Sequence, residues 1–80
     1  MTTLTRRHCF LVETYDEADA LLRVLTPFAV MGATIASASL TRGPGGCAVR
    51  IEADGLGEGR AETLLRRLEG LPVVRSVGLG

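Results

Sequence analysis

A histidine and a cysteine stand side by side near the start of the chain, and they are the first candidates for metal binding or nucleophilic chemistry. His8 is the only histidine, and Cys9 and Cys47 are the only cysteines. The residues around His8 alternate as in a strand, so neighbouring side chains point to opposite faces and cannot share a metal without distortion. The cysteines also lack a Cys-x-x-Cys spacing. We therefore predict no metal site, no cofactor and two buried, inert cysteines.

Hydroxyl groups and glycine-rich segments offer two further kinds of chemistry. Ser37, Ser39 and Thr41 carry hydroxyls, but a nucleophilic serine needs a base within hydrogen-bond reach, and nothing in the sequence places the single histidine there. Segments 43–46 and 55–59 are glycine-rich as phosphate-binding loops are, yet the Walker pattern needs a lysine, which this chain lacks. We interpret these segments as a turn and a linker, and we predict no catalytic residue.

Composition excludes other classes of function. Nine acidic residues balance nine basic ones, all arginines, so the basic stripe typical of a nucleic-acid binder is absent. Arg66 and Arg67 have acidic neighbours and fit a solvated helix face. The longest apolar stretch, 28–33, is too short to span a bilayer. Because the opening residues lack the apolar core of a secretory signal, we expect a cytoplasmic protein.

The elements that position these residues follow from hydrophobic periodicity and turn signals. Eighty residues suit one domain whose core is only marginally large enough. The glycine-rich segment 43–46 predicts a hairpin between two of the strands. Strands are expected at 8–13, 33–42, 47–53 and 73–79.

Two amphipathic helices are expected between these strands. The first begins with Asp16 as its N-cap, and Pro27 predicts a kink or an end nearby, with Gly32 as the break before the next strand. Gly70 and the following proline end the second helix. The predicted apolar positions are Ala18, Leu21, Leu22, Leu25 and Phe28 in the first helix and Ala61, Leu64, Leu65 and Leu68 in the second.

Two strand–helix–strand units with right-handed crossovers predict an α+β, ferredoxin-like βαββαβ sandwich. Its four-stranded antiparallel sheet has the order 4-1-3-2, with both helices on one face. Cys9 and Cys47 then lie toward opposite ends of neighbouring antiparallel strands, which disfavours a disulfide. Strand 33–42 is an edge rich in small, uncharged residues, and such an edge favours pairing with another strand.

The chain from about 8 to 79 resembles an ACT domain, a small-molecule-sensing module of metabolic enzymes. The resemblance is carried by the helix followed by segment 31–35 (MGATI), similar to the family's junction of a glycine and a strand. Within the family the chain is most similar to the short regulatory subunits of acetolactate synthase, through segments 22–32 (LRVLTPFAVMG) and 64–77 (LLRRLEGLPVVRSV). The resemblance to ACT domains implies one ACT-like domain over residues 1–80.

The resemblance also implies a homodimer in which strand two pairs with its symmetry mate. A ligand site then forms between the subunits, from the loop after strand one and the start of the neighbour's strand two. The loop differs from many amino-acid-binding ACT domains in having two acids and no glycine. The implied site residues are Thr14, Tyr15 and Asp16 from the loop and Gly32, Ala33, Thr34 and Ile35 across the interface.

From these features we expect a non-catalytic regulatory protein that binds an amino acid or a similar small ligand. It would act allosterically on a separate enzyme, with acetolactate synthase of branched-chain amino acid biosynthesis as the implied partner. Neither nucleic acid nor membrane is an expected partner. A module that only joins proteins and binds no ligand is the alternative, and the missing loop glycine favours it. An acylphosphatase-like enzyme ranks last, because segment 14–17 holds no arginine to bind phosphate.

Overall fold

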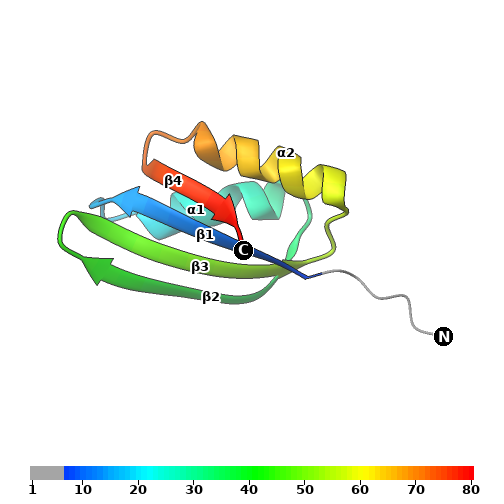
Figure 1. Ribbon diagram of the computed structural model, residues 1–80, viewed down its shortest axis with the longest axis horizontal. Coiled ribbons are helices and arrows are strands. Elements are labelled where there is room, and N and C mark those ends of the chain that lie inside the picture. Colours follow the sequence, from blue (N-terminus) through cyan, green and yellow to red (C-terminus); the bar gives the residue numbers. More distant parts are fainter. Residues whose placement is uncertain (1–6) are drawn as a thin grey trace.

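The computed structural model describes residues 7–80, which form a four-stranded antiparallel sheet with two helices on one face (Figure 1). The elements are β1 (His8–Tyr15), α1 (Ala20–Val30), β2 (Thr34–Gly43), β3 (Gly46–Asp54), α2 (Glu58–Glu69) and β4 (Val74–Leu79). The sheet order β2-β3-β1-β4 is the predicted 4-1-3-2 read from the other edge. The predicted βαββαβ fold is therefore confirmed, while the opening segment used to predict localisation lies mostly outside the described residues.

The core lies between the helices and the two central strands. Alternate residues of β1 and β3 face it, with Phe10 opposite Ile51 and Val12 opposite Val49. Phe28 of α1 meets Phe10 edge to face, with ring centroids 5.0 Å apart at 86°, a preferred aromatic geometry. The strand expected at 47–53 is confirmed, and its alternate residues Cys47, Val49, Ile51 and Ala53 are buried. The apolar face of α2 is also confirmed, since its residues Ala61, Leu64 and Leu68 are buried while Leu65 is half-buried.

Helix α1 differs from its prediction in start and orientation. It begins at Ala20, and the N-cap position belongs to Asp19, not Asp16. The residues it buries are Ala20, Val24 and Phe28. Leu22 is 70% exposed, because Phe28 faces the core and Leu22 lies about 120° away around the helix. The predicted Ala18 precedes the helix and is exposed, and Pro27 lies within the last turn before the helix ends at Val30.

Strand β1 continues through Tyr15, two residues beyond the predicted end at Glu13. Tyr15 pairs with Gly46, and its amide donates to the carbonyl of Val73 at 2.9 Å. Gly46 permits this extension, since a Cβ there would collide with the carbonyl oxygen of Thr14. Thr14 and Tyr15 therefore belong to a strand and not to a loop.

The register of β4 against β1 shifts next to the Glu13–Ser76 pair. Such a bulge places an extra residue on one strand and breaks its alternation. It places Val74 opposite Thr14 and Val77 opposite Val12, so both valines lie on the helix side of the sheet although they are three residues apart. The pattern of these valines could not show which face of the strand was buried.

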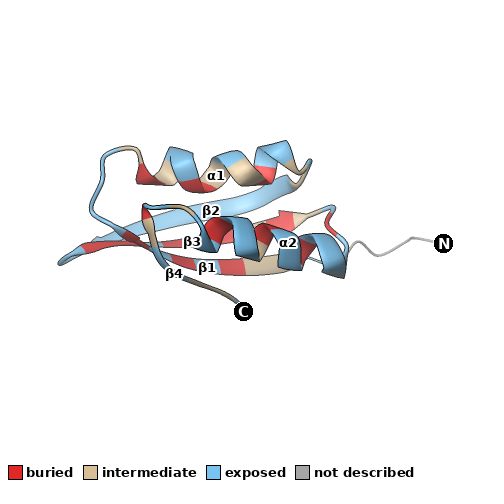
Figure 2. Ribbon diagram, turned by 90° about the horizontal axis from the view of Figure 1, so that it is seen from above, coloured by how far each residue is buried: buried red, intermediate tan, exposed pale blue. Residues whose placement is uncertain are grey.

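The edge strand β2 is exposed along its whole length (Figure 2). Two of its larger apolar residues, Ile35 and Leu40, are 38% and 36% exposed. They pair with the buried Ala53 and Val49 of β3 and therefore lie on the helix side of the sheet, where they are only partly covered. The protomer leaves the outer edge of β2 unpaired and much of the strand's surface exposed.

Candidate functional site

The residues predicted to hold a ligand lie at opposite ends of the sheet. Segment 14–16 ends β1, where Tyr15 pairs with Gly46 at the start of β3. Segment 32–35 leads into β2, where Thr34 pairs with Asp54 at the end of β3. The two ends are about 26 Å apart at a strand rise of about 3.3 Å per residue. One copy of the chain therefore does not bring the two halves of the predicted site together.

An ion pair ties the segment after β1 to the far end of β2. Arg42 donates from Nη1 to Oδ1 of Asp16 at 2.9 Å. Both side chains are more than 60% exposed, and among the described residues the second carboxylate oxygen of Asp16 has no partner. Asp16 thus holds the start of the β1–α1 segment against β2 instead of capping α1.

Arg42 was not among the predicted site residues. Its position next to the glycine-rich turn was visible in the sequence, but its distance of 26 residues from Asp16 hid the contact. Only the sheet order, which brings the end of β2 near the end of β1, could have suggested it. The pair presents one positive and one negative group side by side to solvent.

Thr14 and Tyr15 point to opposite faces of the sheet, as adjacent strand residues do. Thr14 is 1% exposed on the helix side, and its hydroxyl has no hydrogen-bond partner among the described residues. Tyr15 is half-exposed on the open face, where the Arg75 guanidinium lies 5.9 Å from its ring centroid. Of segment 14–16, Asp16 is the residue whose exposed side chain contacts β2, through Arg42.

The segment before β2 is a turn shaped by backbone hydrogen bonds. Gly32 has φ +76°, a conformation that favours glycine, and the Ala33 amide donates to the carbonyl of Phe28 at 3.0 Å. Gly32 therefore separates α1 from β2 as predicted. Thr34 and Ile35 open the strand, and Ala36 is an extra residue in its ladder with β3, a bulge that bends the strand start.

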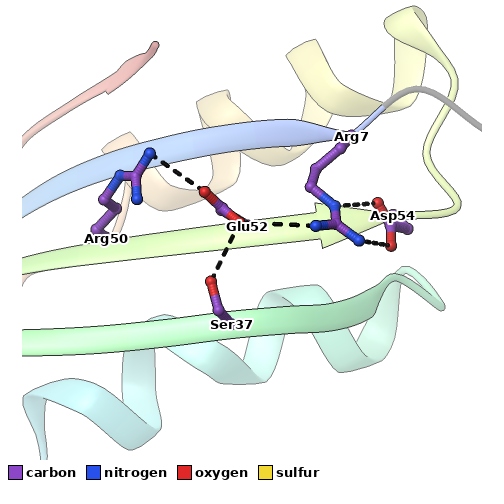
Figure 3. Close-up of polar contacts among 5 residues, drawn as sticks. All are labelled: Arg7, Ser37, Arg50, Glu52 and Asp54. Atoms are coloured by element: carbon purple, nitrogen blue, oxygen red, sulfur yellow. Dashed lines mark hydrogen bonds and ion pairs between the residues drawn. The ribbon is translucent and has the colours of Figure 1, made fainter.

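The open face of the sheet carries a network of paired charges (Figure 3). Arg7 donates twice to Asp54, at 2.9 and 3.0 Å. Glu52 accepts from Ser37 at 3.3 Å and lies 3.2 Å from Arg50 and 3.8 Å from Arg7. The Arg7 hydrogen bonds lower the pKa of Asp54 and the same contacts raise the pKa of Arg7. Since a general acid or base works best with a pKa near neutrality, the network fits a structural role.

The candidates for metal and nucleophilic chemistry stay apart. Cys9 pairs with Glu52 and Cys47 with Thr14, at opposite ends of β1, and both cysteines are free thiols. His8 lies across from Ala53 on the helix side, away from Cys9. Within residues 7–80 no three metal-binding side chains gather at one place, and none of the described helices is long and apolar enough to cross a membrane.

Comparison with solved structures identifies the fold. No family model matches the sequence, and no curated protein matches it. The structure is similar to the crystal structure of the ACT domain from GTP pyrophosphokinase of Chlorobium tepidum, with a TM-score of 0.83 and 12% identity over 96% of this chain and 100% of that chain. A solution NMR structure of the same domain gives a TM-score of 0.80 and 12% identity over 94% and 85% of the two chains. The chain therefore folds as an ACT domain does.

Proposed function

We propose that this chain is a non-catalytic regulatory domain of the ACT family, which pairs with a second copy through β2 and binds an amino acid at the interface. The observation that carries the proposal is the fully exposed edge strand β2, with the Asp16–Arg42 ion pair at its end. The ACT fold supports a regulatory role, because the modules of this family typically sense small molecules.

Strand β2 has the properties of an interface strand. An edge strand presents unpaired backbone N–H and C=O groups, and proteins usually protect such edges with charges, proline or short length. Here ten residues are exposed, and Arg42 is the only charged one. Pairing with a second β2 satisfies these groups and covers Ile35 and Leu40, which the helices leave exposed.

A two-fold dimer also completes the site. When two β2 strands pair antiparallel about a two-fold axis, the start of one lies beside the end of the other. Segment 32–35 of the second copy then lies near Arg42 and Asp16. A free amino acid carries an ammonium and a carboxylate. The free oxygen of Asp16 suits the ammonium, and the remaining guanidinium nitrogens of Arg42 suit the carboxylate.

The proposed identity of the regulated enzyme is supported by sequence resemblance alone. Segments 22–32 and 64–77 favour acetolactate synthase, with a branched-chain amino acid as the effector. The enzyme named with the similar structures is a GTP pyrophosphokinase. A ligand acts allosterically only through its different affinity for two states, and a site shared by two copies provides such a difference when the copies move. The cytoplasmic location stays a prediction.

A protein-joining module without a ligand is the second candidate. It is favoured by the Asp16–Arg42 contact itself, because these two groups already satisfy part of each other's charge. The backbone after β1 also has no glycine to let its amides approach a ligand closely. In this case β2 still forms the dimer.

Thermal unfolding against the twenty amino acids, with the mass in solution measured alongside, tests the proposal. A ligand that binds only the folded state raises the melting temperature by mass action. A selective rise with valine, leucine or isoleucine in a dimer supports the sensor and its proposed enzyme. A dimer with no shift for any amino acid supports the protein-joining module, and a monomer contradicts both.

A further inference from the structure

A groove of about 340 Å³ runs between the two helices. Thr26, Pro27 and Val30 line it from α1, and Arg66, Arg67 and Leu71 line it from α2 and the turn that follows. None of these residues belongs to β2.

The floor of the groove is apolar and open to solvent. Val30 is 68% exposed, although Val24 and Phe28 of the same helix are buried. The hydroxyl of Thr26 donates to the carbonyl of Leu22 at 2.8 Å, so this side chain brings no unsatisfied donor to the groove. Leu22 is itself 70% exposed and lies one turn before Thr26 on the helix surface. Two exposed apolar side chains, Leu22 and Val30, therefore flank Thr26 on the outside of α1, and Val30 lines the groove.

The two arginines at the groove differ from the other arginines that the structure describes. Arg66 and Arg67 have no carboxylate within 4.0 Å among residues 7–80 whose side chains are described, and both are exposed. Arg60 donates to the carbonyl of Met31. Each of the others forms an ion pair with an acid: Arg7, Arg23, Arg42, Arg50 and Arg75.

We propose that this groove docks an acidic segment of another polypeptide, with carboxylates at Arg66 and Arg67 and an aliphatic side chain over Val30. The inference rests on the proposed function in assuming a separate partner protein, and it names the surface that contacts this partner. The C-terminal end of the α2 dipole favours positively charged side chains, which accounts for the two arginines in its last turn. The unpaired guanidinium groups beside an apolar floor favour an occupant with both carboxylates and apolar side chains.

Fluorescence anisotropy of the full chain with a labelled synthetic peptide tests the proposal. The probe is a helical peptide with glutamate on one side and leucine on the other. Two control peptides replace its glutamates with lysine or its leucines with serine. The variant R66Q/R67Q removes the two charges, and V30S makes the floor polar. The matched control R50Q/R75Q removes two charges from the open sheet face, where neither residue touches the groove.

We expect the wild type and R50Q/R75Q to bind the probe equally, and R66Q/R67Q to bind it about two- to thirtyfold more weakly, as expected for two charges at the rim of an interface. V30S also weakens binding, and both control peptides bind more weakly than the probe. No binding of the probe, or equal binding by R66Q/R67Q, overturns the proposal. The amino-acid melting shift and the dimer mass are separate readouts, so failure here leaves the proposed ligand site and dimer standing.

Discussion

Replacing Asp16 with asparagine separates the proposed ligand role of this carboxylate from its part in holding the chain after β1. Asp19 provides a matched control in the same segment. It is also partly exposed and pairs with Arg23 at 2.8 Å, close to the 2.9 Å of the Asp16–Arg42 pair. Asp16→Asn and Asp19→Asn each remove one exposed ion pair, but only the first lies beside the end of β2.

Without ligand the two variants should behave alike. An exposed ion pair contributes about 0.2–1 kcal/mol to the free energy of unfolding. For a domain of this length, 1 kcal/mol corresponds to about 4–8 °C in melting temperature. Each variant should therefore melt about 1–8 °C below the wild type.

With ligand the two variants should diverge. An amino acid at 100 times its Kd stabilises the folded wild type by about 2.7 kcal/mol. Loss of one charge-assisted hydrogen bond to its ammonium costs about 1.5–3 kcal/mol, so the same concentration stabilises Asp16→Asn by only about 0.3–1.3 kcal/mol. Asp19→Asn should keep the full shift.

Differential scanning fluorimetry at one fixed amino-acid concentration measures both effects. The ligand-induced shift of Asp16→Asn should fall to half of the wild-type shift or less. Equal shifts in the wild type and both variants would refute the role given to Asp16. Equal losses in both variants would also refute it, because they would show a general effect of charge in this segment.

Three further predictions concern the fold. Gly46→Ala should lower the free energy of unfolding by about 1–3 kcal/mol, because the added Cβ collides with backbone. The control Gly78→Ala has open space at its Cβ and should be neutral or slightly stabilising. Equal effects of the two variants in urea unfolding would contradict this. Since Arg7 lowers the pKa of Asp54, this pair stabilises the fold above about pH 4 and stops doing so as the pH falls through the lowered pKa. Asp54→Asn should thus lower the melting temperature at pH 7 and not at pH 2, and a difference of the same size at both would count against it. Phe28→Ala should lower the free energy of unfolding by about 3–5 kcal/mol, in a domain whose total free energy of unfolding is expected to be about 4–12 kcal/mol. A loss below 1 kcal/mol in urea unfolding would show that this ring is not central to the core.

The hairpin and the buried faces of β3 and α2 could be predicted because each depends on local periodicity or turn residues, and the sheet order followed from the rule of right-handed crossovers. The start of α1 could not. Asp16 has the chemistry of an N-cap, yet its carboxylate pairs with Arg42 on a distant strand. Likewise, Leu22 fits an apolar stripe by spacing, but the direction of α1 is set by the contact of Phe28 with Phe10. Tertiary contacts decided both cases.

The candidate site was predictable only in part. The choice of segments 14–16 and 32–35 follows from topology and from the resemblance to ACT domains, and their meeting across a β2 dimer is part of the proposal. Arg42 could not be identified in this way, because its partner Asp16 lies on another element. Thr14 is buried and Tyr15 faces the other side of the sheet, since β1 extends two residues further than its alternation indicated. Because β1 ends at Tyr15 and not at Glu13, Thr14 and Tyr15 are strand residues and are not part of the loop that was expected to contact a ligand.

Sedimentation equilibrium of the wild type and of Ala38→Lys, with Ala48→Lys as control, tests the central claim most directly. Both alanines are exposed strand residues, one on β2 and the other on β3. A lysine on an edge strand opposes pairing, so the wild type and Ala48→Lys should sediment at twice the 8.5 kDa of one chain, and Ala38→Lys at the mass of one chain. A wild type that stays at 8.5 kDa, or an Ala38→Lys variant that remains a dimer, would contradict a regulatory dimer built on β2.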